Sequence, residues 1–261
     1  MRLYPTLLIG LSFISFLSLT PYLRAETPLD SFLSQFPGPI YQDVVIDGEI
    51  YPIGTDLCEP RYALIKPILN LFDRPFSVFD LGAAQGYFSF RIARDYPHST
   101  CVMVEANDTS YYSRHGDMLY DLCLKNNDLN NIFYLNKKID AFDLIFLNQK
   151  EHFDIVIAFL VVHLMHEKLQ EQTKIIDSLL TLGDNLILEV ANDVGIVHTA
   201  YVEYLCQSLG GQYLGEVKRH KNQASQSTGK LFWFKQDRSS LSRSELHPET
   251  FTHLNGVYPI R

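Results

Sequence analysis

A glycine-bearing turn carries the clearest chemical signal in this sequence. The turn Asp80-Leu81-Gly82-Ala83-Ala84-Gln85-Gly86 follows a short apolar run and precedes a helix-like segment. Glycine is the residue that a tight strand-to-helix turn needs, and such a turn leaves backbone N–H groups available at the start of the helix. Open α/β folds bind ligands at this place, outside the carboxyl end of a strand. The turn therefore predicts a ligand site, with a purely structural turn as the alternative.

The pattern of the turn favours one kind of ligand over another. A dinucleotide-binding turn reads G-x-G-x-x-G, so that helix N–H groups meet a pyrophosphate. This chain has Gly82 and Gly86 with Ala84 between them, and Asp80 stands before the first glycine. A carboxylate at that point suits a cationic ligand with an amino group and a sulfonium better than a diphosphate. A nicotinamide-dependent oxidoreductase is therefore disfavoured.

The segments around the turn predict an α/β fold. Strand-like and helix-like runs alternate, and several of the strand-like runs are apolar throughout, which argues for a parallel sheet covered on both faces. Two final strand-like runs have no helix between them and predict an antiparallel pair at an edge of the sheet. The predicted strands are 76–81, 100–105, 132–135, 153–158, 185–190, 213–218 and 230–235; the predicted helices are 62–72, 111–126, 141–147, 162–182 and 197–209, besides the one that follows the turn.

The turn and the next strand end resemble motif I of the class I S-adenosylmethionine-dependent methyltransferases, whose usual form is D/E-x-G-x-G-x-G. Ala84 stands at the middle glycine, a small-residue variant that leaves room for the ligand. Glu105 closes the second predicted strand, where the family's acidic residue binds the two ribose hydroxyls of the cofactor. The resemblance covers residues 61–236, because Phe153-Asp154 and the last two strands also fit the family's pattern.

The resemblance implies an α/β, Rossmann-like, seven-stranded mostly parallel sheet with an antiparallel last strand and helices on both faces. It also implies S-adenosylmethionine as the cofactor and methyl transfer as the activity. Arg61-Tyr62, near the start of the first helix of this domain, would cap the cofactor pocket. The implied cofactor-binding residues are Asp80, Gly82, Ala83, Ala84, Gln85, Gly86, Tyr87, Glu105, Ala158 and Phe159.

The acceptor side of the site is less well marked. By the same resemblance, Phe159 and His163, after the fourth strand, face the methyl-transfer site. His163 could act as a catalytic base, hydrogen-bond the acceptor, or simply begin a helix. No Asn-Pro-Pro-Tyr type motif follows this strand, which argues against methylation of the amino groups of bases or glutamine. We therefore expect a small-molecule or glycan-like acceptor.

Charge and cysteine content bear on the partners of the protein. The 261 residues carry a formal net charge of −8, which disfavours nucleic acid as a partner. The segment from Lys218 to Lys230 is the one basic concentration, and it predicts either a contact with an anionic substrate or a solvated hairpin end. The four cysteines are widely spaced, without a CxxC pair or a metal-type cluster, so they predict buried free thiols and no metal site.

The N-terminus predicts a segment outside the fold. Arg2 precedes the apolar run 7–19, and Ala25 offers a cleavage point, as in a secretory signal peptide; a membrane anchor through residues 3–23 is the alternative. Residues 26–60 then form an extended lead-in with one small hairpin, and residues 237–261 form a C-terminal tail. S-adenosylmethionine is made in the cytoplasm, so an active enzyme implies a cytoplasmic domain. An exported or membrane-attached binding module with a catalytically inactive methyltransferase fold is the alternative function.

Overall fold

The computed structural model of the chain describes residues 26–107, 114–192, 196–221, 227–236 and 257–259, together with Thr250 and Leu254. The predicted signal peptide or anchor, residues 1–25, lies outside this part of the chain. Within the described part, none of the helices combines the length and the apolar character that a membrane span requires.

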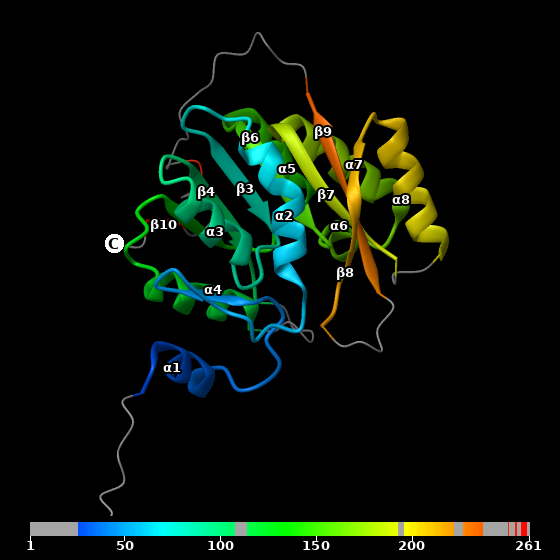
Figure 1. Cartoon of the computed structure of the whole chain (residues 1–261). Helices are drawn as coiled ribbons and strands as arrows, with labels where there is room; N and C mark the ends of the chain where they lie inside the picture. Colours follow the sequence, from blue (N-terminus) through cyan, green and yellow to red (C-terminus); the bar gives the residue numbers. More distant parts are fainter. Residues whose placement is uncertain are drawn as a thin grey trace, which may run out of the picture.

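An eight-stranded sheet forms the centre of the molecule (Figure 1). Its strands are β3 (Ser77–Leu81), β4 (Thr100–Glu105), β5 (Ile132–Asn136), β6 (Phe153–Phe159), β7 (Gly183–Ala191), β8 (Gln212–Lys218), β9 (Thr228–Lys235) and β10 (Val257–Pro259). They lie in the order β10-β5-β4-β3-β6-β7-β9-β8. The five strands β5, β4, β3, β6 and β7 run parallel, whereas β9 is antiparallel to both of its neighbours, β7 and β8.

This sheet confirms the predicted fold class and adds one strand to it. The seven strands β3 to β9 form the predicted mostly parallel sheet, and the last of them is antiparallel. The additional strand, β10, runs antiparallel to β5 at the sheet edge, where Val257 pairs with Leu135 and Pro259 with Phe133. It belongs to the segment 237–261 that the sequence indicates only as a tail, because three residues are too few to show an alternating pattern.

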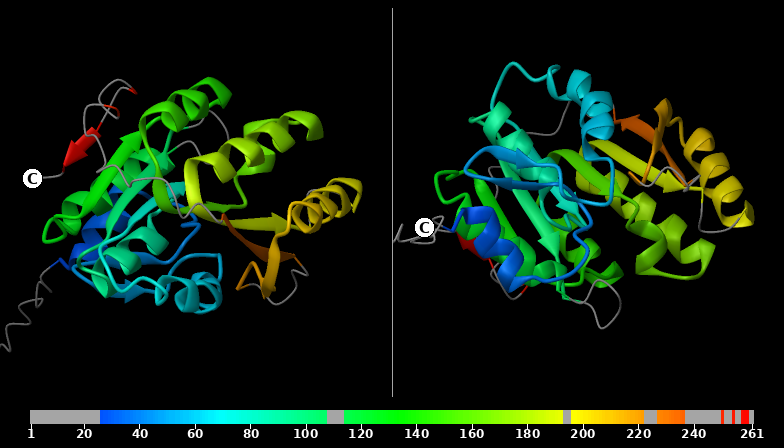
Figure 2. Two further views of the ribbon diagram at one scale, coloured as in Figure 1. Left: turned by 90° about the horizontal axis from the view of Figure 1, so that it is seen from above. Right: turned by 60° about the horizontal axis from the view of Figure 1, so that its bottom comes forward.

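Helices cover both faces of the sheet, as predicted (Figure 2). They are α2 (Cys58–Leu69), α3 (Tyr87–Asp95), α4 (His115–Lys125), α5 (Ala141–Lys150), α6 (Val162–Met165), α7 (Leu169–Leu182) and α8 (Ile196–Ser208). β3 shows how the sequence builds the two layers, because successive side chains of a strand point to opposite faces. Val78 packs into the core with α2, α3 and α4, whereas the next residue, Phe79, packs into the core with α5, α7 and α8.

The lead-in is not extended throughout, because it begins with a helix. The helix α1 (Pro28–Gln35) starts after Thr27, whose hydroxyl accepts a hydrogen bond from the Asp30 N–H at 3.1 Å, and the Asp30 carboxylate in turn binds the Thr27 N–H. The predicted hairpin follows as β1 (Val44–Ile46) and β2 (Glu49–Tyr51), joined by Asp47-Gly48, both with positive φ. Phe32 of α1 and all of β1 are buried in the core that contains α2, α3 and α4. The lead-in is therefore a packed part of the fold.

The single helix predicted over residues 162–182 is two helices. His166 has extended backbone angles, φ −155° and ψ 141°, and separates α6 from α7. Its backbone carbonyl accepts a hydrogen bond from the Gln172 side chain at 2.7 Å, and its Nδ1 accepts one from the Lys168 N–H at 3.0 Å. These two bonds offer an alternative to the helical hydrogen bonds at this point. The break leaves α6 as a short helix next to the end of β6.

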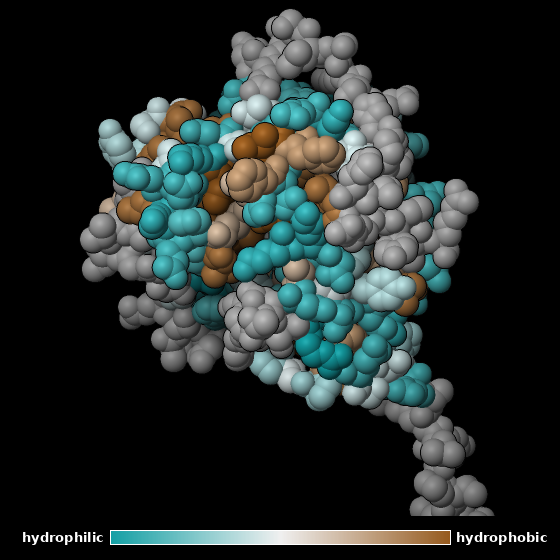
Figure 3. All heavy atoms as spheres, turned by 180° about the vertical axis from the view of Figure 1, so that it is seen from behind, coloured by the Kyte–Doolittle hydropathy of each residue, from teal (hydrophilic) through white to brown (hydrophobic). Residues whose placement is uncertain are grey.

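The rear face of the molecule exposes a group of apolar side chains. Figure 3 shows apolar side chains gathered among polar ones on this face. The helices on this side carry large exposed apolar residues, among them Phe142 and Ile145 on α5 and Leu164 on α6. Leu164 also lines the pocket that the next section describes, so one of these residues belongs to the candidate site.

Candidate functional site

The glycine turn adopts a conformation that requires its glycines. Gly82 and Gly86 have φ of 75° and 74°, in the left-handed region that side chains disfavour. A Cβ atom on Gly86 would also lie 2.7 Å from side-chain atoms of Leu119 and Phe90, so there is no room for a larger residue. Ala84, at the middle position of the motif, has a positive φ of 51° as well, which means that the chain follows a glycine-like path there.

Glu105 is held against this turn by backbone hydrogen bonds. The Ala84 N–H donates to Glu105 Oε2 at 2.8 Å, and the Ala106 N–H donates to Oε1 at 2.9 Å. Both the turn and Glu105 stand at carboxyl ends of adjacent parallel strands, β3 and β4, which explains why residues far apart in sequence meet. The carboxylate is therefore fixed at the place where a ligand bound by the turn would present its hydroxyl groups.

A pocket opens at these strand ends. About 960 Å³ of space, open solvent at its mouth included, lies between its lining residues. Five of the predicted site residues line it: Gly82, Ala84, Glu105, Phe159 and His163. The other lining residues are Tyr41, Leu81, Val104, Ala106, His115, Lys137, Lys138, Ile139, Leu160, Val161, Leu164, Met165 and Arg219. The apolar walls and the single acidic group among these residues suit a nucleoside with a free diol.

Asp80 is predicted to contact the cofactor, but it does not line the pocket. Its side chain is buried, 3% exposed, and its carboxyl group accepts a hydrogen bond from the Ser89 hydroxyl at 2.7 Å. Burial raises the pKa of Asp80 to about 7; the bond from Ser89 opposes this shift, and the negative charge of Glu105 adds to it. The structure therefore places Asp80 behind the turn, where its carboxyl group is bonded to Ser89 of α3.

The remaining predicted cofactor residues also lie behind the pocket. Ala83 and Ala158 are fully buried, and Gly86 begins α3. Gln85 is 0% exposed, and its Oε1 accepts a hydrogen bond from the Gln42 N–H of the lead-in at 2.7 Å. In return, Gln42 Oε1 accepts a hydrogen bond from the Tyr87 N–H at 3.1 Å. These side chains therefore join the glycine turn to the lead-in.

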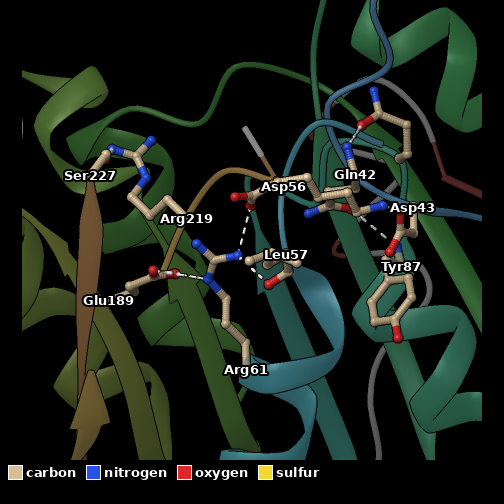
Figure 4. A network of polar contacts seen from close by, with 11 residues as sticks. Gln42, Asp43, Asp56, Leu57, Arg61, Tyr87, Glu189, Arg219 and Ser227 are labelled. Carbon is tan, nitrogen blue, oxygen red and sulfur yellow. Dashed lines mark hydrogen bonds and ion pairs between the residues drawn. The ribbon is translucent and has the colours of Figure 1, made fainter. Parts of the chain in front are cut away.

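Arg61 does not cap the pocket, because it lies inside the protein. It is 1% exposed, its Nε donates to both carboxylate oxygens of Glu189 at 2.9 and 2.8 Å, and its Nη1 donates to Asp56 at 2.8 Å (Figure 4). Burial raises the pKa of both acids, and the Arg61 guanidinium opposes that shift. Gly229 of β9 makes room for this ion pair, since a Cβ there would lie 1.8 Å from Glu189 Oε1. The predicted partner Tyr62 does not line the pocket either; its hydroxyl donates to Asp95.

The start of the basic segment after β8 is held against the lead-in, so this part of the segment is not a solvated hairpin end. Arg219 is 8% exposed and lines the pocket, and its backbone carbonyl accepts a hydrogen bond from the Leu57 N–H at 2.8 Å. Lys221 forms an ion pair with Asp43 and donates to the Pro52 carbonyl at 2.9 Å. This segment is therefore fastened to the lead-in. Residues 222–226 lie outside the described part of the chain.

Two further residues that line the pocket, Tyr41 and His115, lie in segments in which the sequence shows no motif. Tyr41 of the lead-in stacks on His115 at the start of α4, with ring centroids 6.1 Å apart and an interplanar angle of 21°. Burial raises the pKa of the Tyr41 phenol and lowers that of the His115 imidazole to about 4. Tyr41 is therefore protonated and His115 neutral near pH 7. The sequence offers no periodicity or spacing that links these two residues to each other or to the turn.

The opposite wall of the pocket is built by the end of β6 and by α6. Phe159 ends the strand, and Leu160 follows with a positive φ of 56°, unusual for a branched side chain. Strained residues of this kind persist where the surrounding structure fixes them, often at ligand sites. His163 lies one turn further on, in α6, and lines the pocket.

The cysteines of the described residues form neither disulfides nor a metal site. All four cysteines are buried and free, as predicted. Among the described residues, no group of three or more histidine, cysteine or acidic side chains is arranged to hold a metal ion.

Comparisons with known proteins identify the fold. No family model matches the sequence, and the curated proteins contain no significant match. Among solved structures, the bifunctional kinase-methyltransferase WbdD aligns with a TM-score of 0.58 and 21% identity over 79% of this chain, which spans 46% of the WbdD chain. The N-terminal domain of EvdMO1, solved with S-adenosylhomocysteine and D-fucose, aligns with a TM-score of 0.53 and 12% identity, over 79% of this chain and 94% of that domain. The chain has the class I methyltransferase fold.

Proposed function

We propose that this chain, which has the class I methyltransferase fold, transfers a methyl group from S-adenosylmethionine to a small-molecule or glycan-like acceptor. The observation that carries the proposal is the Glu105 carboxylate, held at the glycine turn by the Ala84 and Ala106 N–H groups in the lining of a pocket. The EvdMO1 domain in the comparison was solved with a sugar, which supports a glycan-like acceptor. The negative net charge speaks against nucleic acid.

Glu105 is the residue we assign to the nucleoside part of the cofactor. A carboxylate accepts hydrogen bonds only, and the two neighbouring hydroxyls of a ribose are donors that match its two oxygens. The glycines keep the backbone of the turn free of side chains beside the ligand. The apolar residues Val104 and Ile139 at the adjacent strand ends offer a surface for the adenine ring.

The transfer step asks little of the protein beyond alignment. The cofactor supplies an electrophilic methyl group: the lone pair of the acceptor forms the new bond to carbon while the S–C bond breaks and its electron pair stays on sulfur. Phe159 and His163 line the part of the pocket where the acceptor would be held. If the acceptor atom is a hydroxyl, its proton must leave, and His163 is the residue we assign to receive it.

The first prediction tests the assignment of Glu105. Glu105→Gln keeps the size of the side chain but removes the charge and half of the acceptor capacity, and a hydrogen bond to a charged group is worth about 1.5–3 kcal/mol. We expect the affinity for S-adenosylmethionine to fall at least tenfold, measured by calorimetry on the full chain. Glu171→Gln is the matched control, because Glu171 lies on α7 outside the pocket lining and pairs with Lys174. Unchanged affinity in E105Q would remove the assignment.

Calorimetry together with a methyl-transfer assay separates the enzyme from the alternative function. Wild-type chain that binds S-adenosylmethionine and also binds S-adenosylhomocysteine, the product, behaves as a methyltransferase should. Binding of the cofactor with no transfer to any sugar or small-molecule acceptor in a radiolabelled methyl assay would favour the binding module. Absence of binding by the wild-type chain would remove the proposed function.

A further inference from the structure

The position of the Glu105 carboxylate depends on one backbone N–H group beyond the end of β4. The Ala106 N–H donates to Glu105 Oε1 at 2.9 Å, so this oxygen lies where Ala106 directs it. Glu105 is the last residue of β4, and Ala106 has therefore already left the strand. Two sets of contacts anchor the chain on either side of Ala106, one at the Glu105 carbonyl and one at Asn107.

Tyr134 of β5 provides the first anchor. Its hydroxyl lies 2.9 Å from the carbonyl oxygen of Gly116 in α4 and 3.3 Å from the carbonyl oxygen of Glu105, and it donates its hydrogen to this pair of oxygens. The Tyr134 side chain is 2% exposed and packs into the core with α2, α3 and α4, which restricts its movement. Burial raises the pKa of the phenol, and the negative charge of Glu105 adds to this shift. The hydroxyl therefore keeps its proton and remains a donor near pH 7.

Asn107 provides the second anchor. Its Nδ2 donates to Asp117 Oδ1 at 2.6 Å, and the Asp117 N–H donates to Asn107 Oδ1 at 3.0 Å. Asp117 stands in the first turn of α4, ten residues further along the chain. An amide that donates with its nitrogen and accepts with its oxygen is fixed in orientation as well as in position. The segment that leaves β4 is therefore tied to the start of α4.

Gly116 allows α4 to approach closely enough for both anchors. A Cβ atom on this residue would lie 3.0 Å from Asn107 N, from Asn107 Oδ1 and from Tyr134 Oη, closer than side-chain carbons normally come. The preceding residue, His115, lines the pocket. The same turn of α4 thus holds the Glu105 segment and forms part of the pocket wall.

We propose that Tyr134 and Asn107 are positioning residues for cofactor binding, which fix Ala106 so that its N–H holds the Glu105 carboxylate toward the ribose hydroxyls. Neither is among the described residues that line the pocket, so both would act through Glu105. The proposal rests on the proposed function, because it takes Glu105 as the residue that binds the nucleoside. A carboxylate that is already held in place loses less conformational freedom when the ligand binds, and this raises the affinity.

The test is a double-mutant cycle with Glu105. Tyr134→Phe removes the hydroxyl and keeps the buried ring. By calorimetry on the full chain, we expect it to weaken S-adenosylhomocysteine binding about fivefold or more when Glu105 is present. In the E105Q background the loss should be less than about twofold, because the charged group that the anchor positions is gone. Tyr96→Phe is the matched control: its hydroxyl donates to Asn70, outside the pocket lining, and the affinity should stay unchanged in both backgrounds.

Asn107→Ala tests the second anchor and keeps the proposal testable if Tyr134→Phe does not fold, because the Asn107 side chain is exposed. We expect about a threefold or larger loss of affinity when Glu105 is present and less than about a twofold loss in E105Q. A loss of equal size in the two backgrounds would mean that the variant loosens the pocket by a route other than Glu105, and it overturns the proposal. Unchanged affinity in Y134F and N107A overturns it as well.

The wild-type chain and E105Q report separately on the proposed function. If the wild-type chain does not bind S-adenosylhomocysteine, the proposed function fails and the positioning role fails with it. If the wild-type chain binds and E105Q weakens binding, but Y134F and N107A do not, the proposed function stands and only the positioning role is overturned.

Discussion

Asp80 illustrates at the scale of one residue how burial changes the task of a motif side chain. Its carboxyl group lies behind the glycine turn and is bonded to Ser89. Burial raises its pKa to about 7, above the value near 3.9 of an unfolded chain. The folded protein therefore binds this proton more tightly than the unfolded chain does. The stability that Asp80 contributes is present at acidic pH and is lost as the pH rises through about 7.

This direction of the pH dependence of stability leads to the second prediction. Asp80→Asn keeps the shape of the side chain and removes its titration. Between pH 5 and pH 8, measured by urea unfolding, we expect the wild type to lose about 2–4 kcal/mol of unfolding free energy relative to D80N. Asp177→Asn on α7 serves as the control and should run parallel to the wild type. Parallel curves for D80N as well would mean that Asp80 titrates normally in the folded protein.

The contribution of the buried ion pair between Arg61 and Glu189 to stability cannot be inferred from its presence alone. Removing one partner of a buried ion pair leaves an uncompensated charge and costs about 3–5 kcal/mol, yet replacing both by apolar groups is often neutral. The ion pair therefore need not make the folded protein more stable than an apolar pair of similar size would. Its effect is positional: α2 supplies Arg61, β7 supplies Glu189 and the lead-in supplies Asp56, so one guanidinium fixes three segments.

At the scale of elements, the lead-in acts as a strap between the two halves of the sheet. It is bonded to the glycine turn through Gln42 and Gln85, and to the segment after β8 through Asp43 and Lys221. Tyr41, which lines the pocket, immediately precedes these attachments in the sequence and stacks on His115. The position of one pocket wall therefore depends on side chains that never touch the ligand.

The third prediction separates this role of Gln85 from cofactor binding. Gln85→Leu removes the acceptor of the buried Gln42 N–H, and leaving a buried donor unsatisfied costs about 1–3 kcal/mol. We expect that loss in the unfolding free energy from urea titration, together with a smaller loss of S-adenosylmethionine affinity than in E105Q. Gln207→Leu on α8 is a control for the loss of an exposed amide. An affinity loss in Q85L equal to that in E105Q, without destabilisation, would return Gln85 to the cofactor site.

The order of elements was predictable because its signals are local. The central strands β3, β4 and β6 are apolar runs, and the structure has them within a residue of the predicted bounds. Glu105 and the glycines were found for the same reason, since each stands at the end of an apolar run in the sequence.

What could not be predicted depends on the sheet being assembled. The basic composition of the segment after β8 favours a solvated hairpin end over a contact with an anionic substrate, and only the assembled sheet brings Arg219 to the pocket. The burial of Arg61 likewise depends on Glu189, whose acidic side chain in an apolar strand carries no sign of its partner. The break at His166 arises from hydrogen bonds to its own neighbours, which compete with a helical pattern that remains intact on both sides.

On the scale of the whole molecule, β10 protects an edge of the sheet. Without it, β5 would present a row of unpaired N–H and C=O groups, and such edges promote association between molecules. The three paired residues of β10, opposite Phe133 to Leu135, cover this edge.

The fourth prediction follows from this cover. Truncation after Gln236 removes β10 and should raise the fraction of dimers and larger species in size-exclusion chromatography with light scattering. A second truncated chain carrying Phe133→Lys, a charge on the exposed edge strand, should return toward the monomer because charged side chains block edge pairing. Identical elution of the full and the truncated chain would show that β10 is not what protects β5.

The strap also joins residues that leave the ribosome at very different times. The contact between Asp43 and Lys221 spans 178 residues, and that between Arg61 and Glu189 spans 128. Contacts at such separations close late, because the chain between them must first be ordered. The glycine turn and Glu105 are translated long before Arg219 exists. A nascent chain therefore carries the Glu105 side of its pocket as an open half-sheet until the segment with Arg219 has been translated.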